Sequence, residues 1–437
     1  QEVVTKGNSE SESEDEDKRA LSVTAAGRAR LDLEEEARLD PRIVPTEVVP
    51  PEEWTTLAMA SAVFLTGCTG FLGAFLLSDV LEKTKATVLC IVRPRGGDTS
   101  ERALKAVIKK NLDQYNLQVK DWARVKPIAG DLSKLRMGMD EDEFESVAKE
   151  CDCIIHSGAH VNLVYPYAAL KPANVQGTTE ILKLAVMGRA KAKTVIHIST
   201  NAVLPAGADV PRACERVYSE DDELADYSRE VTGGYGQSKW VAERMIWEAR
   251  NRGVPVVVIR PGNIAGHTLT GSSNMSDHIF LTISACIKAG CFPRVDEWVF
   301  EMTPVDFISH IILTLGSNPT YFNQAYHLID PTPVSAAVAM RWVEGILGVS
   351  LDEVEFEEWR RRVKGAFHAL TEAEISIFAE LDTPESLSSS SSLQVSSSKV
   401  DAVAAEAGRP RQRVNARSFQ QYIQFYRKKG LILANQE

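Results

Sequence analysis

Short apolar segments alternate with longer amphipathic segments from residue 62 onward, which is typical of strands joined by helices. The predicted strands are 63–65, 87–92, 125–129, 153–156, 194–198 and 256–259. The predicted helices are 71–82, 102–115, 144–150, 168–187 and 236–252. Because strands and helices alternate regularly, we expect an α/β fold with a doubly wound parallel sheet.

The same pattern divides the chain into three parts. Residues 1–55 are polar, acidic and rich in proline, and we expect a largely disordered linker that wraps onto a domain. Residues 56–265 form the doubly wound domain. Residues 266–437 are helices separated by irregular turns, which predicts a smaller, mostly helical lobe over the ligand crevice. Within this lobe, the serine-rich stretch 386–398 is predicted to be a disordered insertion.

Composition excludes several classes of function. The net charge is −11, and residues 10–17 hold six carboxylates in eight positions, so nucleic acid is not an expected partner. The chain has no apolar run long enough to span a membrane and no secretory signal at its start. The seven cysteines lack the paired spacings of a metal site or disulfide framework. We therefore expect a cytoplasmic protein with reduced thiols and no metal.

A glycine turn follows the first strand. Gly67, Gly70 and Gly73 have the spacing G-x-x-G-x-x-G, and the residues after them have helical periodicity. Glycines let the backbone approach a phosphate closely, and a helix start offers it unpaired N–H groups. The turn therefore predicts a nucleotide site.

The end of the second strand indicates which nucleotide binds. Arg93 lies 20 residues after Gly73, where a carboxylate would select NAD. An arginine there suits the 2′-phosphate of NADP(H). Arg102 or Arg95 is a candidate for a second cation. Asp131, after the third strand, is positioned either to accept from the adenine amino group or to cap a turn.

The fifth strand and the helix after it carry the candidate catalytic groups. Tyr235 and Lys239 are four residues apart, so they share one face of the predicted helix. A nearby ammonium favours phenolate and is expected to lower the tyrosine pKa, so that the phenol can donate to a carbonyl oxygen at working pH. We predict that the Thr200 hydroxyl at the strand end hydrogen-bonds that carbonyl, and Ser199 is the alternative for this role.

These motifs, together with Arg260-Pro261-Gly262-Asn263, resemble the extended short-chain dehydrogenase/reductases. More narrowly, with Ser157-Gly158-Ala159 and Thr303-Pro304-Val305-Asp306, the chain resembles the thioester reductase domains of nonribosomal peptide synthetases, polyketide synthases, carboxylic acid reductases and aminoadipate reductase. The resemblance implies a catalytic set of Thr200, Tyr235 and Lys239. It implies a cofactor site lined by Thr66, Gly67, Thr69, Gly70, Phe71, Leu72, Gly73, Arg93, Arg102, Asp131, Leu132, Asn174, Tyr235, Lys239, Pro261 and Asn263. For Asn174 an alternative is that it satisfies a buried backbone group.

The resemblance further implies NADPH-dependent release of an acyl thioester as an aldehyde, or as the alcohol after a second reduction. The expected partner is a phosphopantetheinylated carrier domain upstream in the same polypeptide, and the domain itself is expected to be monomeric. Three alternatives remain open: cyclising release without a redox step, a non-catalytic NADP-sensing protein, and a sugar-nucleotide enzyme of the extended family. Retention of Tyr235 argues against the first two.

Overall fold

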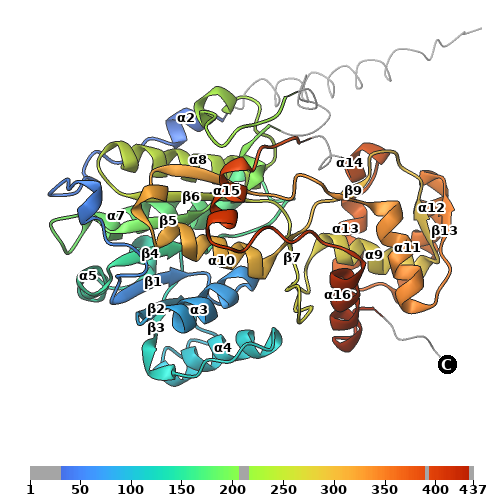
Figure 1. Ribbon diagram of the computed structural model, residues 1–437, viewed down its shortest axis with the longest axis horizontal. Coiled ribbons are helices and arrows are strands. Elements are labelled where there is room, and N and C mark those ends of the chain that lie inside the picture. The colour runs from blue at the N-terminus through green and yellow to red at the C-terminus, as the bar shows by residue number, and fades with distance from the viewer. Residues whose placement is uncertain (1–30, 206–215, 389–392, 433–437) are drawn as a thin grey trace, which may run out of the picture.

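A parallel sheet lies at the centre of the fold in the computed structural model, which describes residues 31–205, 216–388 and 393–432 (Figure 1). Its seven strands have the order β11-β6-β5-β4-β1-β2-β3. They are β1 (Ala62–Thr66), β2 (Thr87–Val92), β3 (Val125–Ala129), β4 (Cys153–His156), β5 (Thr194–Ile198), β6 (Val256–Pro261) and β11 (Gln324–Leu328). The strand order reverses between β1 and β4, and ligands of such sheets bind at this point, beyond the carboxyl ends of the strands.

Alternate residues of each strand point to opposite faces of the sheet. Val63 and Leu65 of β1 belong to one apolar core, whereas Phe64 between them belongs to the other. Both cores are buried because helices cover both faces, as expected for an all-parallel sheet. The register is set by pairs such as Val63 with Val88 and Val63 with Cys153.

Helices form a layer on each side of the sheet (Figure 1). The first core is covered by α3 (Phe71–Lys83), α4 (Glu101–Gln114), α10 (Val305–Gly316) and α15 (Ser398–Glu406). The second is covered by α5 (Glu141–Glu150), α7 (Gly177–Val186) and α8 (Gly234–Asn251). The predicted single helix 168–187 is instead α6 (Tyr167–Lys171), a π-helical turn (Pro172–Gln176) and α7. Pro172 has no N–H to continue the α-helical ladder.

The helical lobe lies beside the sheet domain (Figure 1). Its helices are α9 (His278–Ala289), α11 (Ala336–Leu347), α12 (Phe356–Gly365), α13 (Glu372–Glu380), α14 (Pro384–Ser388) and α16 (Ala416–Lys428). Short strand pairs are β7 (Ile264–Ala265) with β10 (Thr303–Pro304), β9 (Val299–Phe300) with β12 (Val334–Ser335), and β8 (Cys291–Pro293) with β13 (Asp352–Val354). Single helical turns occur at Pro51–Glu53, Trp122–Arg124, Leu135–Gly138, Asn201–Val203, Leu224–Tyr227, Pro319–Tyr321 and Phe367–Ala369.

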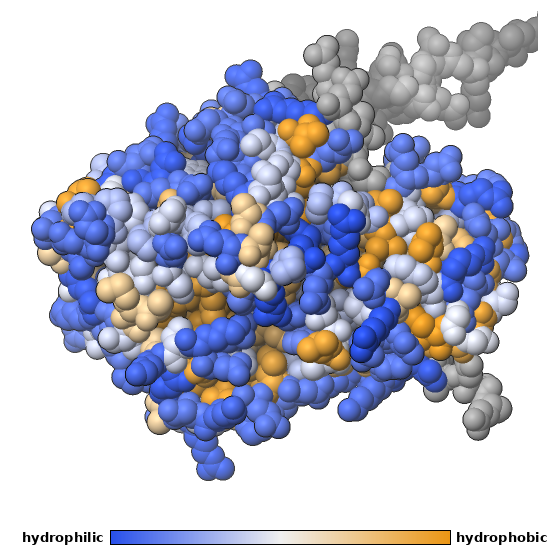
Figure 2. Space-filling view, viewed as in Figure 1, coloured by the Kyte–Doolittle hydropathy of each residue, from blue (hydrophilic) through white to orange (hydrophobic). Residues whose placement is uncertain are grey.

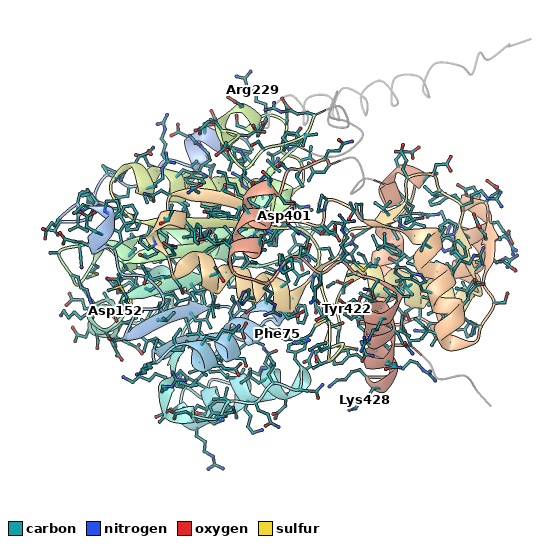
Figure 3. The ribbon with its side chains drawn as sticks, viewed as in Figure 1. Phe75, Asp152, Arg229, Asp401, Tyr422 and Lys428 are labelled. Carbon is teal, nitrogen blue, oxygen red and sulfur yellow. The ribbon has the colours of Figure 1, made fainter. Side chains whose placement is uncertain are left out.

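The two parts are interleaved in sequence, so the expected boundary at residue 265 is too simple. The strand β11 completes the sheet, and α10 and α15 cover it, although all three come after residue 265. At the boundary between the two parts, Figure 3 shows Phe75 of α3 on one side and Tyr422 of α16 on the other. The ring of Phe75 lies 5.8 Å from that of His267. His267 therefore packs against α3 at this boundary.

The described part of the N-terminal segment is ordered against the sheet domain. It contains the short helix α2 (Leu33–Glu36), and Leu33, Leu39 and Ile43 are buried in the second core. Arg252 donates to the carbonyl oxygens of Leu39, Asp40 and Ile43 at 2.7–3.1 Å. The prediction of a linker that is largely disordered to residue 55 is therefore wrong from about residue 33, because its apolar residues are buried. Its acidic tract lies outside the described residues.

The serine-rich stretch also differs from the expectation of disorder. The α14 helix ends at Ser388, and residues 389–392 lie outside the described part. Beyond them, Val395 pairs with Tyr218 in a parallel bridge, and the Ser396 carbonyl contacts a ring nitrogen of His327 at 2.8 Å. The stretch therefore includes an ordered segment that covers β11.

Hydrophilic residues cover much of the face shown in Figure 2. Within the described ranges, no helix is both long and apolar enough to cross a bilayer. Six of the seven cysteines are buried free thiols, which confirms the prediction for them, and Cys214 lies outside the described residues.

Candidate active site

The glycine turn lies between β1 and α3 at the carboxyl edge of the sheet. Gly67 has a φ of +78°, and a Cβ there would lie 2.8 Å from the backbone nitrogen of Gly158. A Cβ on Gly73 would lie 2.0 Å from the Gly67 carbonyl oxygen. Both positions therefore require glycine. Asn111 of α4, which the motif did not predict, donates to the Cys68 and Gly70 carbonyls at 3.2 and 3.1 Å and holds the turn.

The start of α3 is suited to a phosphate. Its N-cap is Gly70, which has no side chain to satisfy the first N–H groups of the helix. Thr69 and Gly70 are exposed, whereas Leu72 is buried and Phe71 is partly buried. Unpaired amides at a helix start bind anions through hydrogen bonds and the helix dipole. The predicted turn residues therefore form a surface that fits the diphosphate of a dinucleotide.

Arg93 and Asp131 contact each other at the ends of β2 and β3. The Arg93 Nε lies 3.2 Å from a carboxylate oxygen of Asp131, and the Arg93 side chain is 73% exposed. Burial favours a raised pKa for Asp131, but hydrogen bonds from Ser133 and the Arg93 charge outweigh it, so its pKa lies below the usual value. In the described part of the chain, the two terminal nitrogens of Arg93 have no protein acceptor. Arg102 is exposed on the first turn of α4.

Thr66 holds two strand ends together. Its hydroxyl accepts from the Gly158 N–H at 2.8 Å and contacts Nδ1 of His156 at 2.9 Å. The other ring nitrogen of His156 lies 3.0 Å from the Thr178 hydroxyl. Burial, with the Lys239 charge, lowers the pKa of His156 to about 3, so the ring is neutral. Thr66 therefore positions the loop after β4.

Thr200 and Tyr235 meet where β5 ends and α8 begins. The Thr200 hydroxyl accepts from the Ala202 N–H at 3.2 Å and is near enough to the Tyr235 phenol to influence its pKa. Burial raises the pKa of Tyr235 to about 12, and the nearby Thr200 hydroxyl acts in the opposite direction. The expectation that Lys239 lowers this pKa is therefore not met. A phenol that stays protonated at neutral pH is the form that donates to a carbonyl oxygen.

Lys239 is buried one turn further along α8. Its ammonium donates to the Ile198 carbonyl at 2.9 Å and lies 3.5 Å from Nε2 of His197. Burial lowers the pKa of Lys239 to about 8, although the carboxylate of Glu243 raises it. His197 is also buried, and its pKa lies well below the usual value because of burial and the Lys239 charge.

The Ser199 hydroxyl is used in a buried hydrogen-bond network, which favours Thr200 as the hydroxyl that would bind a substrate carbonyl. Ser199 donates to Glu243 at 2.5 Å, and Arg260 of β6 donates to the same carboxylate at 2.7 Å. Arg260 also contacts Nε2 of His327 on β11 at 3.1 Å. The network joins α8 to three strand ends. Glu243 was not predicted, but its spacing of four residues after Lys239 places it on the same helix face.

The remaining predicted residues support neighbouring loops. Asn174 is buried, accepts from the His160 N–H at 2.7 Å and donates to the Ser238 hydroxyl at 3.0 Å. This agrees with the alternative in which Asn174 satisfies buried backbone. Leu132 is partly buried against the Gly158 loop, which has no room for a Cβ.

Pro261 ends β6, and the N–H of Asn263 donates to Glu301 at 2.5 Å. Glu301, whose pKa burial raises to about 7, also accepts from Thr303 and from the Asp330 N–H. No spacing in the sequence indicated it. No cluster of three or more metal-ligating side chains occurs within the described ranges.

The comparisons with known proteins agree with this geometry. The NAD-binding family described as male sterility protein matches residues 65–312, more than half of the chain. A solved terminal R domain from the myxalamid PKS-NRPS pathway is 32% identical, with a TM-score of 0.81, over 92% of this chain and 98% of that one. The chain belongs to this family of terminal reductase domains. The predicted fold and the predicted family are therefore confirmed.

Curated relatives of the reductase domain are much longer proteins. Glycine betaine reductase ATRR of Emericella nidulans is 39% identical over 340 residues, which are 76% of this chain and 25% of that protein. A linear gramicidin synthase of Brevibacillus parabrevis is 37% identical over 333 residues, 76% of this chain and 6% of that protein. The chain spans a quarter or less of these relatives. It is an oxidoreductase domain that uses a nicotinamide cofactor.

Proposed function

We propose that the reductase domain uses NADPH to release a carrier-bound acyl thioester as an aldehyde. The observation that carries this proposal is the placement of Thr200 and Tyr235 at the carboxyl edge of the sheet, where β5 ends and α8 begins, one helical turn from the buried Lys239. These groups lie on the strand ends next to the nucleotide turn. The site therefore combines a proton donor for a carbonyl oxygen with a binding surface for a dinucleotide.

The residues have separate tasks in this reaction. A bound nicotinamide cofactor supplies the hydride. Thr200 and Tyr235 hydrogen-bond the carbonyl oxygen, and Tyr235 gives its proton to the oxygen as negative charge develops there. The product is a hemithioacetal, in which the carbon has gained a C–H bond. When its C–S bond breaks, the hydroxyl proton passes to the sulfur, which leaves an aldehyde and a free thiol.

Lys239 acts through its charge. Its ammonium donates to the Ile198 carbonyl and would donate to the ribose hydroxyls of a bound cofactor. We therefore assign its charge to cofactor binding and not to the pKa of Tyr235, which burial raises. Catalytic roles for Thr200, Tyr235 and Lys239 are thus part of the proposal.

The choice of NADPH over NADH depends on Arg93. Its free terminal nitrogens and its exposure at the end of β2 suit an arginine that contacts a 2′-phosphate in two hydrogen bonds. Asp131 would orient Arg93 through their ion pair, and Arg102 on α4 is the candidate for a second cation.

A carrier domain upstream is the proposed partner. The N-terminal segment is fixed beside the site, since Glu36 accepts from the Tyr167 hydroxyl and from Lys171, both at 2.7 Å. The segment that would lead to an upstream carrier therefore enters the described part of the chain near α6. Its phosphopantetheine arm would bring the thioester to Tyr235.

A matched pair of tyrosine variants tests the function. Tyr235→Phe removes the proton donor, and we expect turnover of octanoyl-CoA to fall by about 10²–10⁴-fold, measured as NADPH absorbance. Tyr321→Phe is the control, because Tyr321 lies before β11 at the amino edge of the sheet, far from the strand ends that form the site. Full turnover by Tyr235→Phe would refute the assigned mechanism.

The same assay separates the alternatives. A cyclising domain would consume the thioester without oxidising NADPH. A sensor would bind NADPH tightly and turn over no thioester. A sugar-nucleotide enzyme would turn over a nucleotide sugar instead.

A further inference from the structure

The loop after β4 exposes four apolar side chains within five residues. Val161, Leu163, Val164 and Tyr165 are 65%, 57%, 64% and 47% exposed. Single exposed apolar residues are common, but neighbouring ones form a patch that marks a binding surface. We call these four residues the apolar lip. No residue from 161 to 165 is charged.

Hydrogen bonds hold the loop in this shape. Asn162 accepts from the N–H groups of Val164 and Tyr165 at 3.0 and 2.8 Å. Asn174 bonds both the N–H and the carbonyl of His160, at 2.7 and 3.1 Å. The rings of His160 and Tyr165 meet edge to face at 5.7 Å. The apolar side chains are therefore presented on a preorganised backbone.

The apolar lip lies next to Tyr235. A Cβ on Gly234 would come within 2.3 Å of the Tyr165 carbonyl oxygen and 2.5 Å of the Pro166 backbone. Gly234 directly precedes Tyr235 in α8, and α6, which follows the loop, packs against α8. When the carbonyl oxygen of a substrate contacts Tyr235, the apolar lip is therefore within reach of its acyl chain.

We propose that the apolar lip binds the apolar chain of the acyl group, so that the domain prefers thioesters of extended apolar acyl chains to acetyl thioesters. This inference rests on the proposed function for the position of the carbonyl. The phosphopantetheine arm is a poorer occupant, because its amide, hydroxyl and phosphate groups need polar partners. A carrier domain is also a poorer occupant, since a stable protein interface uses about 20–30 residues on each side.

Binding of unreactive thioethers tests the proposal without requiring turnover. S-octyl-CoA and S-methyl-CoA share the phosphopantetheine arm and differ only in the apolar chain. We expect the wild-type chain, saturated with NADP⁺, to bind S-octyl-CoA at least 10-fold more tightly, measured by calorimetry. The double variant Leu163→Asn/Val164→Thr should lose at least 10-fold of this preference, while its affinity for S-methyl-CoA stays within twofold.

The matched control is Met59→Asn. Met59 is 73% exposed but lies just before β1, at the amino edge of the sheet and opposite the site. It should leave both affinities unchanged. A wild-type chain without preference for the octyl chain would overturn the proposal, as would a double variant that keeps the preference.

Two further results separate related ideas. If the double variant instead slows acetyl- and octanoyl-loaded carrier equally and leaves both thioether affinities unchanged, the apolar lip docks the carrier, and the acyl-chain proposal is wrong. If the wild-type chain binds S-octyl-CoA tightly but does not oxidise NADPH with octanoyl-CoA, the lip proposal stands and the proposed function fails.

Discussion

Replacing Lys239 with methionine should stabilise the fold at neutral pH while it removes activity. Lys239 is 2% exposed, and burial lowers its pKa from 10.5 to about 8 against the opposing effect of Glu243. This difference corresponds to roughly 3 kcal/mol by which the charged lysine destabilises the fold below pH 8. Losing its hydrogen bond to Ile198 costs about 1 kcal/mol. Lys239→Met should therefore raise the free energy of unfolding by roughly 2 kcal/mol at pH 7.

The gain should depend on pH in a defined direction. Between pH 8 and 10.5 the unfolded wild-type chain binds more protons at Lys239 than the folded chain, so wild-type stability rises with pH across this window. The methionine variant lacks this rise, so its advantage should shrink between pH 8 and 10. Urea unfolding at pH 7 and 9.5 measures both effects. Lys110→Met, on the exposed face of α4, is the control. A Lys239→Met chain less stable than the wild type at pH 7, or an advantage independent of pH, would refute the reasoning.

Three other changes test the site. Glu243→Gln or Arg260→Met alone should lower the free energy of unfolding by about 3–5 kcal/mol, because each leaves a buried charge unpaired. In a urea double-mutant cycle, the double change should cost less than the sum of the two single changes. Additive costs would contradict the pairing. Arg93→Ala should raise the KM for NADPH about 10–100-fold and leave that for NADH unchanged, and equal losses would exclude a 2′-phosphate contact. Stability should barely change, because the Arg93 side chain is 73% exposed and its ion pair with Asp131 is screened by solvent. Gly73→Ala should abolish NADPH binding in a fluorescence titration, since its Cβ overlaps a backbone carbonyl; retained binding would mean that the turn can shift.

The sheet could be predicted because its strands carry their own signal. The segments 87–92, 153–156 and 194–198 are mostly apolar and are bounded by turns, and the structure has strands with these bounds. The segment 125–129 also has its predicted bounds, although Lys126 is exposed on this edge strand. β11 was missed because its residues, Gln324–Leu328, are mixed in polarity, and only the neighbouring β6 and the covering segment around Ser396 bury them. The place of β11 in the sheet depends on contacts with residues distant in sequence.

In the site, too, features set by local sequence could be predicted, and features set by distant contacts could not. The positions of Thr200, Tyr235 and Lys239 follow from local spacing and from the rule that parallel strands end at one edge. The pKa of Tyr235 did not follow, because it depends on how deeply the phenol is buried, which spacing does not reveal. Glu301 gave no signal either, since its three donors come from separate segments.

Under the proposed function, the buried polar groups link catalysis to stability. Lys239 is destabilising as a buried cation, yet the network of Glu243, Arg260 and Ser199 lies directly beneath it on the same helix and strand ends. The carboxylate of Glu243 raises the lysine pKa against burial, so most Lys239 side chains stay charged at neutral pH. Removing Glu243 would therefore weaken both the fold and the charge on Lys239. The network therefore places a carboxylate beside the cation that the proposed mechanism uses.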